Sequence, residues 1–234
     1  MRFGVVIPLA NEEGTIIPLL DRILAQLTPA DAIFCVLDNV SRDRTRELIT
    51  RRGAIDRPVN CVWAPENRCV VDAYFRGYRA AMEAGCEYIL EMDGGFSHSP
   101  EEIPGFIRAM EEGYDFAGGS RFSRGGSHSG SFNRRLVSWG GTVLANALLG
   151  TRMRDMTGGF ECFNRRAMEL VLSHGVRSRA HFFQTEIRYL MHRLRWTEVP
   201  INYRNPSPSV GTGNVREAFG TLGQLTAERF RRAA

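Results

Sequence analysis

A chain of 234 residues with 43% hydrophobic side chains can bury one sizeable core, and its length fits a single α/β domain better than two small ones. Its formal net charge of +4, from 30 basic and 26 acidic side chains, is too small and too scattered to indicate a nucleic-acid-binding protein. It contains neither a stretch of about twenty apolar residues nor a signal-peptide pattern, so the sequence predicts a soluble, cytoplasmic protein.

Arginine and cysteine usage excludes further classes. The sequence has no lysine, so any phosphate contact must use the planar guanidinium group, and a Walker P-loop is excluded. The five cysteines are odd in number and lack CxxC spacing, which indicates reduced core residues and neither a zinc site nor a disulfide framework.

Short apolar runs alternate with amphipathic segments along the first half. Strands are expected at 3–7, 32–37, 59–63, 87–92 and 114–119, and helices at about 12–27, 43–52, 70–84 and 100–112. This alternation predicts a mostly parallel central sheet flanked by helices, with right-handed crossovers.

The second half changes character. Helices are expected at 133–149, 165–172 and 182–194, and strands at 159–163 and 196–200. A tail with Asn-Pro, Ser-Pro and Gly-Thr-Gly then leads into a helix with apolar spacing, at Phe219, Leu222, Leu225 and Phe230.

Polar residues follow the predicted strands. In an open parallel sheet, ligands bind beyond the carboxyl ends of the strands, so these residues are the site candidates. They are Pro8, Asn11 and Glu12, then Asp38 and Asn39, then Asp93, Ser97 and His98, then Ser120 and Arg121. No GxGxxG follows the first strand, which weakens a dinucleotide interpretation.

Several ordered motifs across residues 1–200 resemble one family. VVIPLANEEGTI, LDNVSRDRT, EMDGGFSHSPEEIP, GYDFAGGSRF and RDMTGGFECFNRRAME are similar to motifs of the GT-A glycosyltransferases of family 2. Within these, the chain resembles the dolichol-phosphate mannose synthase-like polyprenyl-phosphate glycosyltransferases. The resemblance implies one GT-A domain over 1–234, with a nucleotide-binding half at about 1–120 and an acceptor half with the tail at about 121–234.

The resemblance assigns nucleotide-sugar contacts to the strand ends. It implies that Pro8, Ala10 and Glu12 line the nucleoside pocket and that Asp38 contacts the base or ribose, while Asn39 replaces a second family Asp. From the residues alone, Asn11 and Glu12 also fit a helix start, and Asp38 a turn.

Asp93 is the main catalytic and metal-binding candidate. Relatives carry Asp-x-Asp here, whereas this chain has DGG, so Gly95 stands at the second acidic position without a side-chain oxygen. The cofactor implied is Mg²⁺ or Mn²⁺, held by Asp93 with phosphate oxygens and water, with help from His98. Metal independence is the alternative, because one carboxylate makes a weak site.

The acceptor contacts implied lie in the second half. Arg121, Arg134 and Arg135 stand where relatives bind the acceptor phosphate. A guanidinium group can bind a phosphate through two parallel hydrogen bonds. Alternatively, these three arginines are ordinary solvent-exposed charges on the surface. Asp155 fits a sugar contact, a general base for a hydroxyl acceptor, or a cap.

Two further groups complete the expected site. Gln184 and Glu186 are expected to grip sugar hydroxyls. Arg204 is expected to hold the donor diphosphate, whereas Asn214 stands near a family lysine that this chain lacks.

The sequence thus predicts an inverting glycosyltransferase that moves a sugar from a GDP- or UDP-sugar to polyprenyl phosphate by single displacement. A lipid acceptor would be reached by peripheral contact at the inner membrane face, through the Arg-ended C-terminal helix. Two alternatives stay open: a soluble enzyme with a nucleoside, sugar or natural-product acceptor, and a degenerate protein that binds nucleotide sugar without turnover.

Overall fold

The computed structural model describes residues 2–56, 58–204 and 212–233. Its centre is a seven-stranded sheet in the order β3-β2-β1-β4-β7-β5-β8. These strands are β1 (Phe3–Leu9), β2 (Ala32–Leu37), β3 (Val59–Trp63), β4 (Tyr88–Glu91), β5 (Phe116–Ser120), β7 (Glu161–Asn164) and β8 (Trp196–Pro200). All neighbours pair in parallel except β7, which runs antiparallel between β4 and β5. The mixed α/β architecture with a mostly parallel sheet is confirmed.

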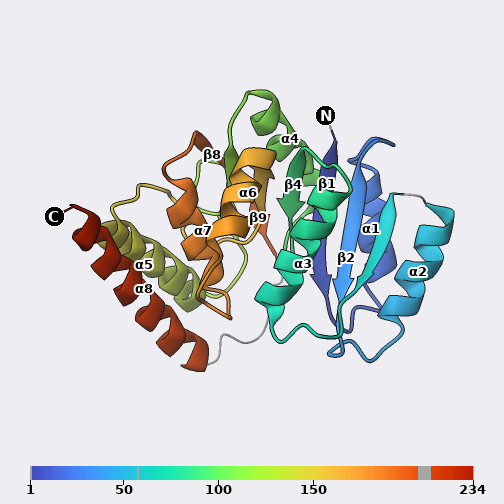
Figure 1. The fold of residues 1–234 in the computed structure, drawn as a ribbon, viewed down its shortest axis with the longest axis horizontal. Coiled ribbons are helices and arrows are strands. Elements are labelled where there is room, and N and C mark those ends of the chain that lie inside the picture. Colours follow the sequence, from blue (N-terminus) through green and yellow to red (C-terminus); the bar gives the residue numbers. More distant parts are fainter. Residues whose placement is uncertain (1, 57, 205–211, 234) are drawn as a thin grey trace.

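Helices cover both faces of the sheet (Figure 1). They are α1 (Ile16–Leu24), α2 (Thr45–Ile55), α3 (Val70–Glu83), η1 (Pro100–Glu102), α4 (Ile103–Glu111), α5 (Phe132–Leu149), α6 (Arg165–His174), α7 (Phe183–Met191) and α8 (Thr212–Ala233). No helix in the described ranges is long and apolar enough to cross a membrane.

The core consists of one apolar cluster on each face of the sheet. Alternate side chains of β1 enter opposite clusters, because a strand presents successive residues to opposite faces. Val6 packs with α3, α6 and α7, whereas Val5 and Ile7 pack with α1 and α4. Strand β2 reads AIFCVL and is buried throughout, as expected for a parallel strand covered on both sides.

Most element predictions are confirmed, with shifted ends. The first helix begins at Ile16 and not near residue 12, because Glu12 and Thr15 form a turn and Asn11 adopts a φ of 59°. Two short strands were not predicted: β6 (Ser127–His128) and β9 (Asn202–Tyr203), which pair in parallel as a separate small sheet. Two-residue strands leave no periodic pattern in a sequence.

Candidate functional site

The predicted site residues of the first half gather at one edge of the sheet. Strands β1, β2 and β4 are parallel neighbours, so the loops after their carboxyl ends lie side by side. Pro8 is the next-to-last residue of β1, and Asp38 and Asp93 come just after β2 and β4. Three separate loops thus bring these residues to the edge of the sheet at which open parallel sheets bind ligands.

Hydrogen bonds join the loops after β1 and β2, where the nucleoside is predicted to bind. Asn11 donates from Nδ2 to the Val40 carbonyl (3.2 Å) and accepts from the Arg42 N–H (2.9 Å). These two hydrogen bonds join the loop after β1 to the loop after β2. Asp38 accepts from the Val40 N–H (2.9 Å), and Asn39 donates to the Pro65 carbonyl (3.1 Å). The turn role of Asp38 is therefore real, and its nucleoside contact stays a prediction.

The other predicted nucleoside residues border the same surface. Ala10 and Asn39 are exposed, while Pro8 and Glu12 are half-buried. The Glu12 N–H donates to Thr45 Oγ1 (2.8 Å), and its carboxylate accepts from the Thr15 hydroxyl. These contacts fix the backbone, and the roles of the four side chains toward a nucleotide stay predictions.

Asp93 presents a half-exposed carboxylate held from two sides. Its Oδ1 accepts from the Tyr74 hydroxyl (2.9 Å) and its Oδ2 from Ser97 Oγ (3.0 Å), while 44% of the side chain is exposed. The Asp93 N–H donates to His98 Nδ1 (3.2 Å). The carboxylate is therefore oriented toward solvent by neighbours on α3 and on its own loop.

His98 supports this loop from inside the protein. Its ring is buried and stacks on Phe160, with ring centroids 4.8 Å apart. Burial lowers the pKa of His98 despite the nearby Asp93 charge, so the imidazole is neutral. Because Nδ1 accepts the backbone N–H, this nitrogen is unavailable to a cation, and the help in metal binding expected from His98 has no support in this geometry.

The two glycines after Asp93 differ in what they require. A Cβ on Gly94 would overlap the buried Leu9 side chain and lie 3.3 Å from the Pro8 carbonyl, so a larger residue requires Leu9 to shift. Gly95 is exposed, has no left-handed φ, and its Cβ would lie 3.5 Å from Glu12 Oε1, an ordinary contact. The structure disfavours a side chain at position 94 but not at position 95.

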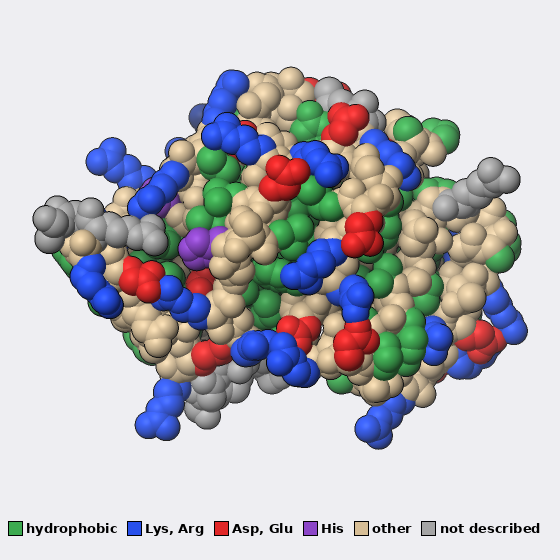
Figure 2. Space-filling model, in the orientation of Figure 1, with side chains coloured by type: hydrophobic (Ala, Val, Ile, Leu, Met, Phe, Trp, Pro, Cys, Tyr) green, Lys and Arg blue, Asp and Glu red, His purple; other side chains and the backbone are tan. Residues whose placement is uncertain are grey.

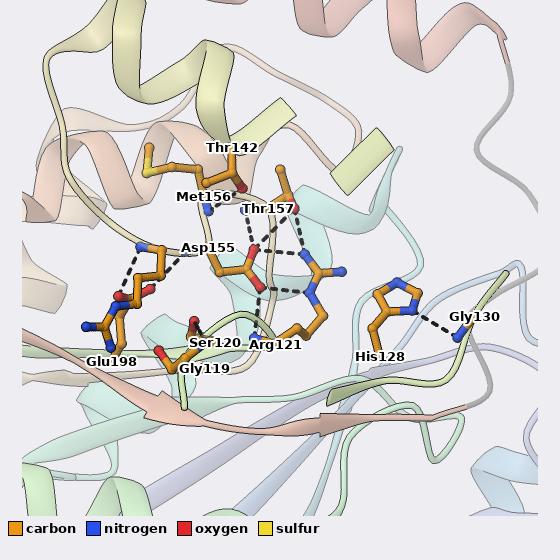
Figure 3. A network of polar contacts seen from close by, with 12 residues as sticks. Gly119, Ser120, Arg121, His128, Gly130, Thr142, Asp155, Met156, Thr157 and Glu198 are labelled. Carbon is orange, nitrogen blue, oxygen red and sulfur yellow. Dashed lines mark hydrogen bonds and ion pairs between the residues drawn. The ribbon is translucent and has the colours of Figure 1, made fainter. Parts of the chain in front are cut away.

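A buried ion pair joins the loop after β5 to the stretch before β7 (Figure 3). Arg121 donates from Nε to Asp155 Oδ2 (2.7 Å), from Nη2 to Asp155 Oδ1 (2.8 Å) and from Nη2 to Thr157 Oγ1 (2.6 Å). Burial alone would raise the pKa of Asp155, but the hydrogen bonds and charge of Arg121 outweigh it and hold that pKa well below its usual range.

This pairing bears on both predicted roles. Asp155 is ionised, fully buried and bonded through both oxygens, which gives no support to a general base and favours a positioning function. Arg121 retains Nη1, which has no hydrogen-bond partner among the described residues. Its predicted phosphate contact stays a prediction that this geometry permits.

Below the site lies a buried polar network that the sequence analysis missed. Arg188 donates from Nε to Glu161 Oε1 (2.6 Å) and from Nη2 to the Gly119 carbonyl (3.0 Å). Glu91 faces Glu161 across the β4–β7 register and accepts from the Tyr78 hydroxyl. Burial and the charge of Glu161 raise the pKa of Glu91 well above its usual range, so Glu91 carries a proton.

Two orphan oxygens agree with this protonation. Glu91 Oε1 and Glu161 Oε2 are buried and lack partners in the described part of the chain. Protonation of Glu91 turns one of these two acceptors into an O–H donor. The sequence signal was the presence of glutamate inside the apolar runs EYILEM and GGFECF, where a buried charge requires a partner.

Gln184 and Glu186 are tied to the protein interior. Gln184 is buried near Glu91, and its Nε2 would lie 2.9 Å from a Cβ built on Gly159. Glu186 accepts from the Ser178 N–H (2.7 Å) and, through both oxygens, from the Arg177 N–H (3.2 and 3.1 Å). These contacts favour structural roles, and the expected contacts with sugar hydroxyls stay predictions.

The remaining arginines of the predicted site have different surroundings. Arg134, in the first turn of α5, acts electrostatically on His128 and Tyr203, which places it on the Arg121 side, and Arg135 is exposed. Arg204 donates its N–H to the Ser97 carbonyl (2.8 Å), and its side chain lines a shallow cavity of about 240 Å³ with Arg22, Phe96 and Ser99.

Part of the tail prediction is not addressed by the structure. Residues 205–211 lie outside the described residues, and so does the Asn214 side chain. Arg204 is therefore the last residue of the predicted site whose surroundings are known.

Potential metal ligands are sparse. Among the described residues, no group of three or more His, Cys, Asp or Glu side chains has the geometry to hold a metal ion. Asp93 is the carboxylate that stands at the expected position. A divalent cation at this edge would need most of its oxygen ligands from a bound diphosphate and water.

The sequence and the fold are similar to those of known proteins. The model of the family described as Glycosyl transferase family 2 matches residues 4–172. Undecaprenyl-phosphate mannosyltransferase of Micrococcus luteus is 27% identical over 87% of this chain and 84% of that protein. Polyprenol monophosphomannose synthase of Mycolicibacterium smegmatis is 28% identical over 96% of this chain and 89% of that protein.

A solved structure shares the fold. Glucosyl-3-phosphoglycerate synthase from Mycobacterium tuberculosis, in complex with Mn²⁺, UDP and glucosyl-3-phosphoglycerate, superposes with a TM-score of 0.68 at 16% identity. The similarity covers 97% of this chain and 80% of that one.

Proposed function

The chain belongs to glycosyl transferase family 2, and from this we propose that it transfers a sugar from a nucleoside-diphosphate sugar to a polyprenyl phosphate. The observation that carries the proposal is the similarity, over most of both chains, to enzymes named for mannose transfer to undecaprenyl phosphate and polyprenol phosphate. Mannose is therefore the first sugar to test.

The sheet edge supplies the donor side of this proposal. The nucleoside lies against the loops after β1 and β2, lined by Pro8, Ala10, Glu12, Asp38 and Asn39. The diphosphate then lies toward the half-exposed carboxylate of Asp93, and Arg204, whose N–H donates to the Ser97 carbonyl of the Asp93 loop, is a cationic candidate for it.

The acceptor side is built around Arg121. Asp155 and Thr157 fix its guanidinium group, so that the remaining Nη1 is oriented before an acceptor arrives. An acceptor phosphate held there presents an oxygen that forms the new bond to the anomeric carbon. The bond from that carbon to the departing diphosphate breaks in the same step, with inversion.

This chemistry requires no strong general base. A phosphate acceptor is already anionic, so no proton has to be removed from it. The surroundings of Asp155 agree with this, because a fully buried carboxylate occupied by Arg121 is a poor proton acceptor. Asp155 acts as a positioning residue for Arg121 in this proposal.

A divalent cation fits this edge only in part. Asp93 is the residue that would hold Mg²⁺ or Mn²⁺, and such an ion, when bound, neutralises charge on the departing diphosphate. The donor set is one carboxylate with two hydrogen-bonded oxygens, so we propose a weak site and a reduced dependence on added metal.

The proposal is tested by direct transfer. The protein is incubated with a polyprenyl phosphate and a panel of GDP- and UDP-sugars that includes GDP-mannose, and the glycolipid is identified by mass spectrometry. Formation of the lipid-linked sugar, lost in Asp93→Asn, is the expected result. Transfer to a small hydroxyl compound but not to the lipid phosphate would favour the alternative acceptor class. A thermal shift with nucleotide sugar but no product would indicate a binding protein.

A lipid acceptor also places the reaction at a membrane. We propose that the protein acts at the cytoplasmic face of the bilayer by peripheral contact, because the proposed acceptor is anchored in a bilayer and the sequence predicts a cytoplasmic protein.

A further inference from the structure

Helix α5 carries an unusual amount of exposed apolar surface. Half of the large hydrophobic side chains that are exposed in the described part of the chain belong to this one helix. They are Phe132, Leu136, Val137, Trp139, Val143 and Leu144. A helix on the surface of a globular protein normally turns polar residues outward, so this face requires a partner.

The spacing of these residues makes one continuous face. Phe132, Leu136, Trp139 and Val143 follow one another at intervals of four, three and four residues, which places them on one stripe of a helix. Val137 and Leu144, seven residues apart, widen this stripe. The opposite side of α5 packs inward through Thr142, Ala145 and Leu149. We call the outer stripe the α5 face.

The chain segment that carries the α5 face has charges of one sign, and the acidic residues of the neighbouring helix α8, Glu217 and Glu228, bond to Arg179 and Arg177. Residues 121–154 contain six arginines and no acidic residue, whereas the rest of the chain has slightly more acidic than basic side chains. Arg135, Arg152 and Arg154 are exposed beside the two ends of the helix. By contrast, Figure 2 shows basic and acidic side chains interspersed on the face that carries α3 and α6.

This charge pattern distinguishes between partners. A twofold contact between two copies of the α5 face would bring the arginines of both copies together without acidic counterparts. A bilayer with anionic headgroups complements both features, because it accepts apolar side chains at the acyl boundary and attracts arginine at its surface.

The inner side of α5 touches the proposed acceptor site. Thr142 Oγ1 accepts from the Met156 N–H (3.1 Å), and a Cβ on Gly141 would lie 3.7 Å from Thr157 Cγ2. The Arg121–Asp155–Thr157 cluster therefore lies directly behind this helix (Figure 3). A helix with its side chains is about 10–12 Å across, so a headgroup at the α5 face is within about one helix diameter of the site.

We propose that the α5 face is the surface by which this protein docks on an anionic lipid bilayer. This inference rests on and deepens the proposed function, and it assigns the contact to α5 and not chiefly to the Arg-ended C-terminal helix expected from the sequence. Helix α8 packs beside α5 and exposes Phe219 and Phe230 (Figure 1), which makes it an auxiliary element.

Vesicle binding tests the proposal directly. The probe is a vesicle of phosphatidylcholine with added phosphatidylglycerol, and binding is measured by cosedimentation. The double variant Val137→Glu/Val143→Glu should reduce partitioning roughly tenfold or more, because it removes apolar burial and adds repulsive charge. The matched control is Val40→Glu/Ile55→Glu, which changes two exposed residues in the β2–α2 region, far from α5 in Figure 1, and should bind like wild type.

Two further measurements keep the proposal falsifiable. Vesicles should shift the tryptophan emission of the wild type to the blue, and Trp139→Phe should remove most of this shift. Thermal melts of each variant establish that it is folded. The proposal is overturned if the wild-type protein does not bind anionic vesicles, or if the α5 double variant binds them as well as the wild type does. A wild-type dimer that α5 substitutions dissociate, without vesicle binding, overturns it in favour of self-association.

An activity comparison separates this inference from the proposed function. The α5 double variant should turn over a short-chain, water-soluble polyprenyl phosphate like wild type and lose activity on a long-chain acceptor in vesicles. If the wild type binds vesicles through the α5 face but glycosylates neither acceptor, docking stands and the proposed function fails. If it glycosylates both acceptors without needing the α5 face, docking fails and the proposed function stands.

Discussion

Replacing Gly95 by aspartate restores the acidic residue that the DGG stretch lacks, and the structure indicates that the fold tolerates it. Gly95 is exposed, its φ lies outside the left-handed region, and the new Cβ would meet only Glu12 Oε1 at 3.5 Å. Substitutions at such surface positions usually change stability by no more than about 0.5 kcal/mol. The Gly95→Asp variant should therefore be folded and carry a second carboxylate near Asp93.

The gain in metal affinity follows from charge. At about 4 Å in water, a carboxylate and a divalent cation attract by about 2 kcal/mol, twice the value for two unit charges. Repulsion of the introduced carboxylate by those of Asp93 and Glu12 removes part of this attraction. A net gain of about 1.4 kcal/mol corresponds to roughly tenfold tighter Mn²⁺ binding.

Calorimetric titration of Mn²⁺ in the presence of a nucleoside diphosphate measures this gain. Gly95→Asn has nearly the same shape without the charge and should bind Mn²⁺ like wild type. Gly94→Asp is the steric contrast, because its Cβ would overlap Leu9, and it should melt at a lower temperature. A folded Gly95→Asp protein with wild-type affinity for Mn²⁺ would refute the reasoning, as would complete, metal-reversible loss of wild-type activity in chelator.

Three other substitutions test the remaining site. Asp93→Asn should abolish transfer and leave the melting temperature nearly unchanged, since the side chain is half-exposed; near-normal turnover would contradict the assignment. Arg121→Ala should lower stability by about 3–5 kcal/mol, because it leaves the Asp155 carboxylate buried and unpaired, and in folded protein it should raise the acceptor KM more than the donor KM. Glu91 has a pKa raised above its ordinary 4.5, so its contribution to stability is full below that pH and is lost as the pH rises through the folded pKa. Glu91→Gln stays neutral throughout, and its melting temperature should fall less than that of wild type above pH 4.5; parallel pH profiles would show that Glu91 does not hold a proton.

The sequence by itself determined the elements and the family. Continuous apolar runs such as AIFCVL identify strands buried on both faces, because burial on both sides of a sheet removes any polar alternation. Motif residues after these runs, Asp38 and Asp93 among them, could be placed at one sheet edge, since the carboxyl ends of parallel strands share that edge. Both inferences use only information local to the chain.

The tertiary structure alone decided which charges meet. Arg121 and Asp155 are 34 residues apart, and nothing in either motif shows that their side chains form an ion pair. Glu91 and Glu161 face each other only because β7 enters the sheet antiparallel beside β4, a choice of strand partner that local periodicity does not encode.

Helix α5 shows the same limit for surfaces. Its sequence mixes large apolar residues with Asn133, Arg134, Arg135 and Asn146, so the pattern alone does not show which apolar side chains are buried. Whether such a helix is buried or exposed depends on what packs against it. In this fold α8 and residues 151–157 cover one side and leave the other to solvent. Hydrophobicity is a property of each residue, whereas exposure is a property of the assembled chain, and only the latter reveals the α5 face.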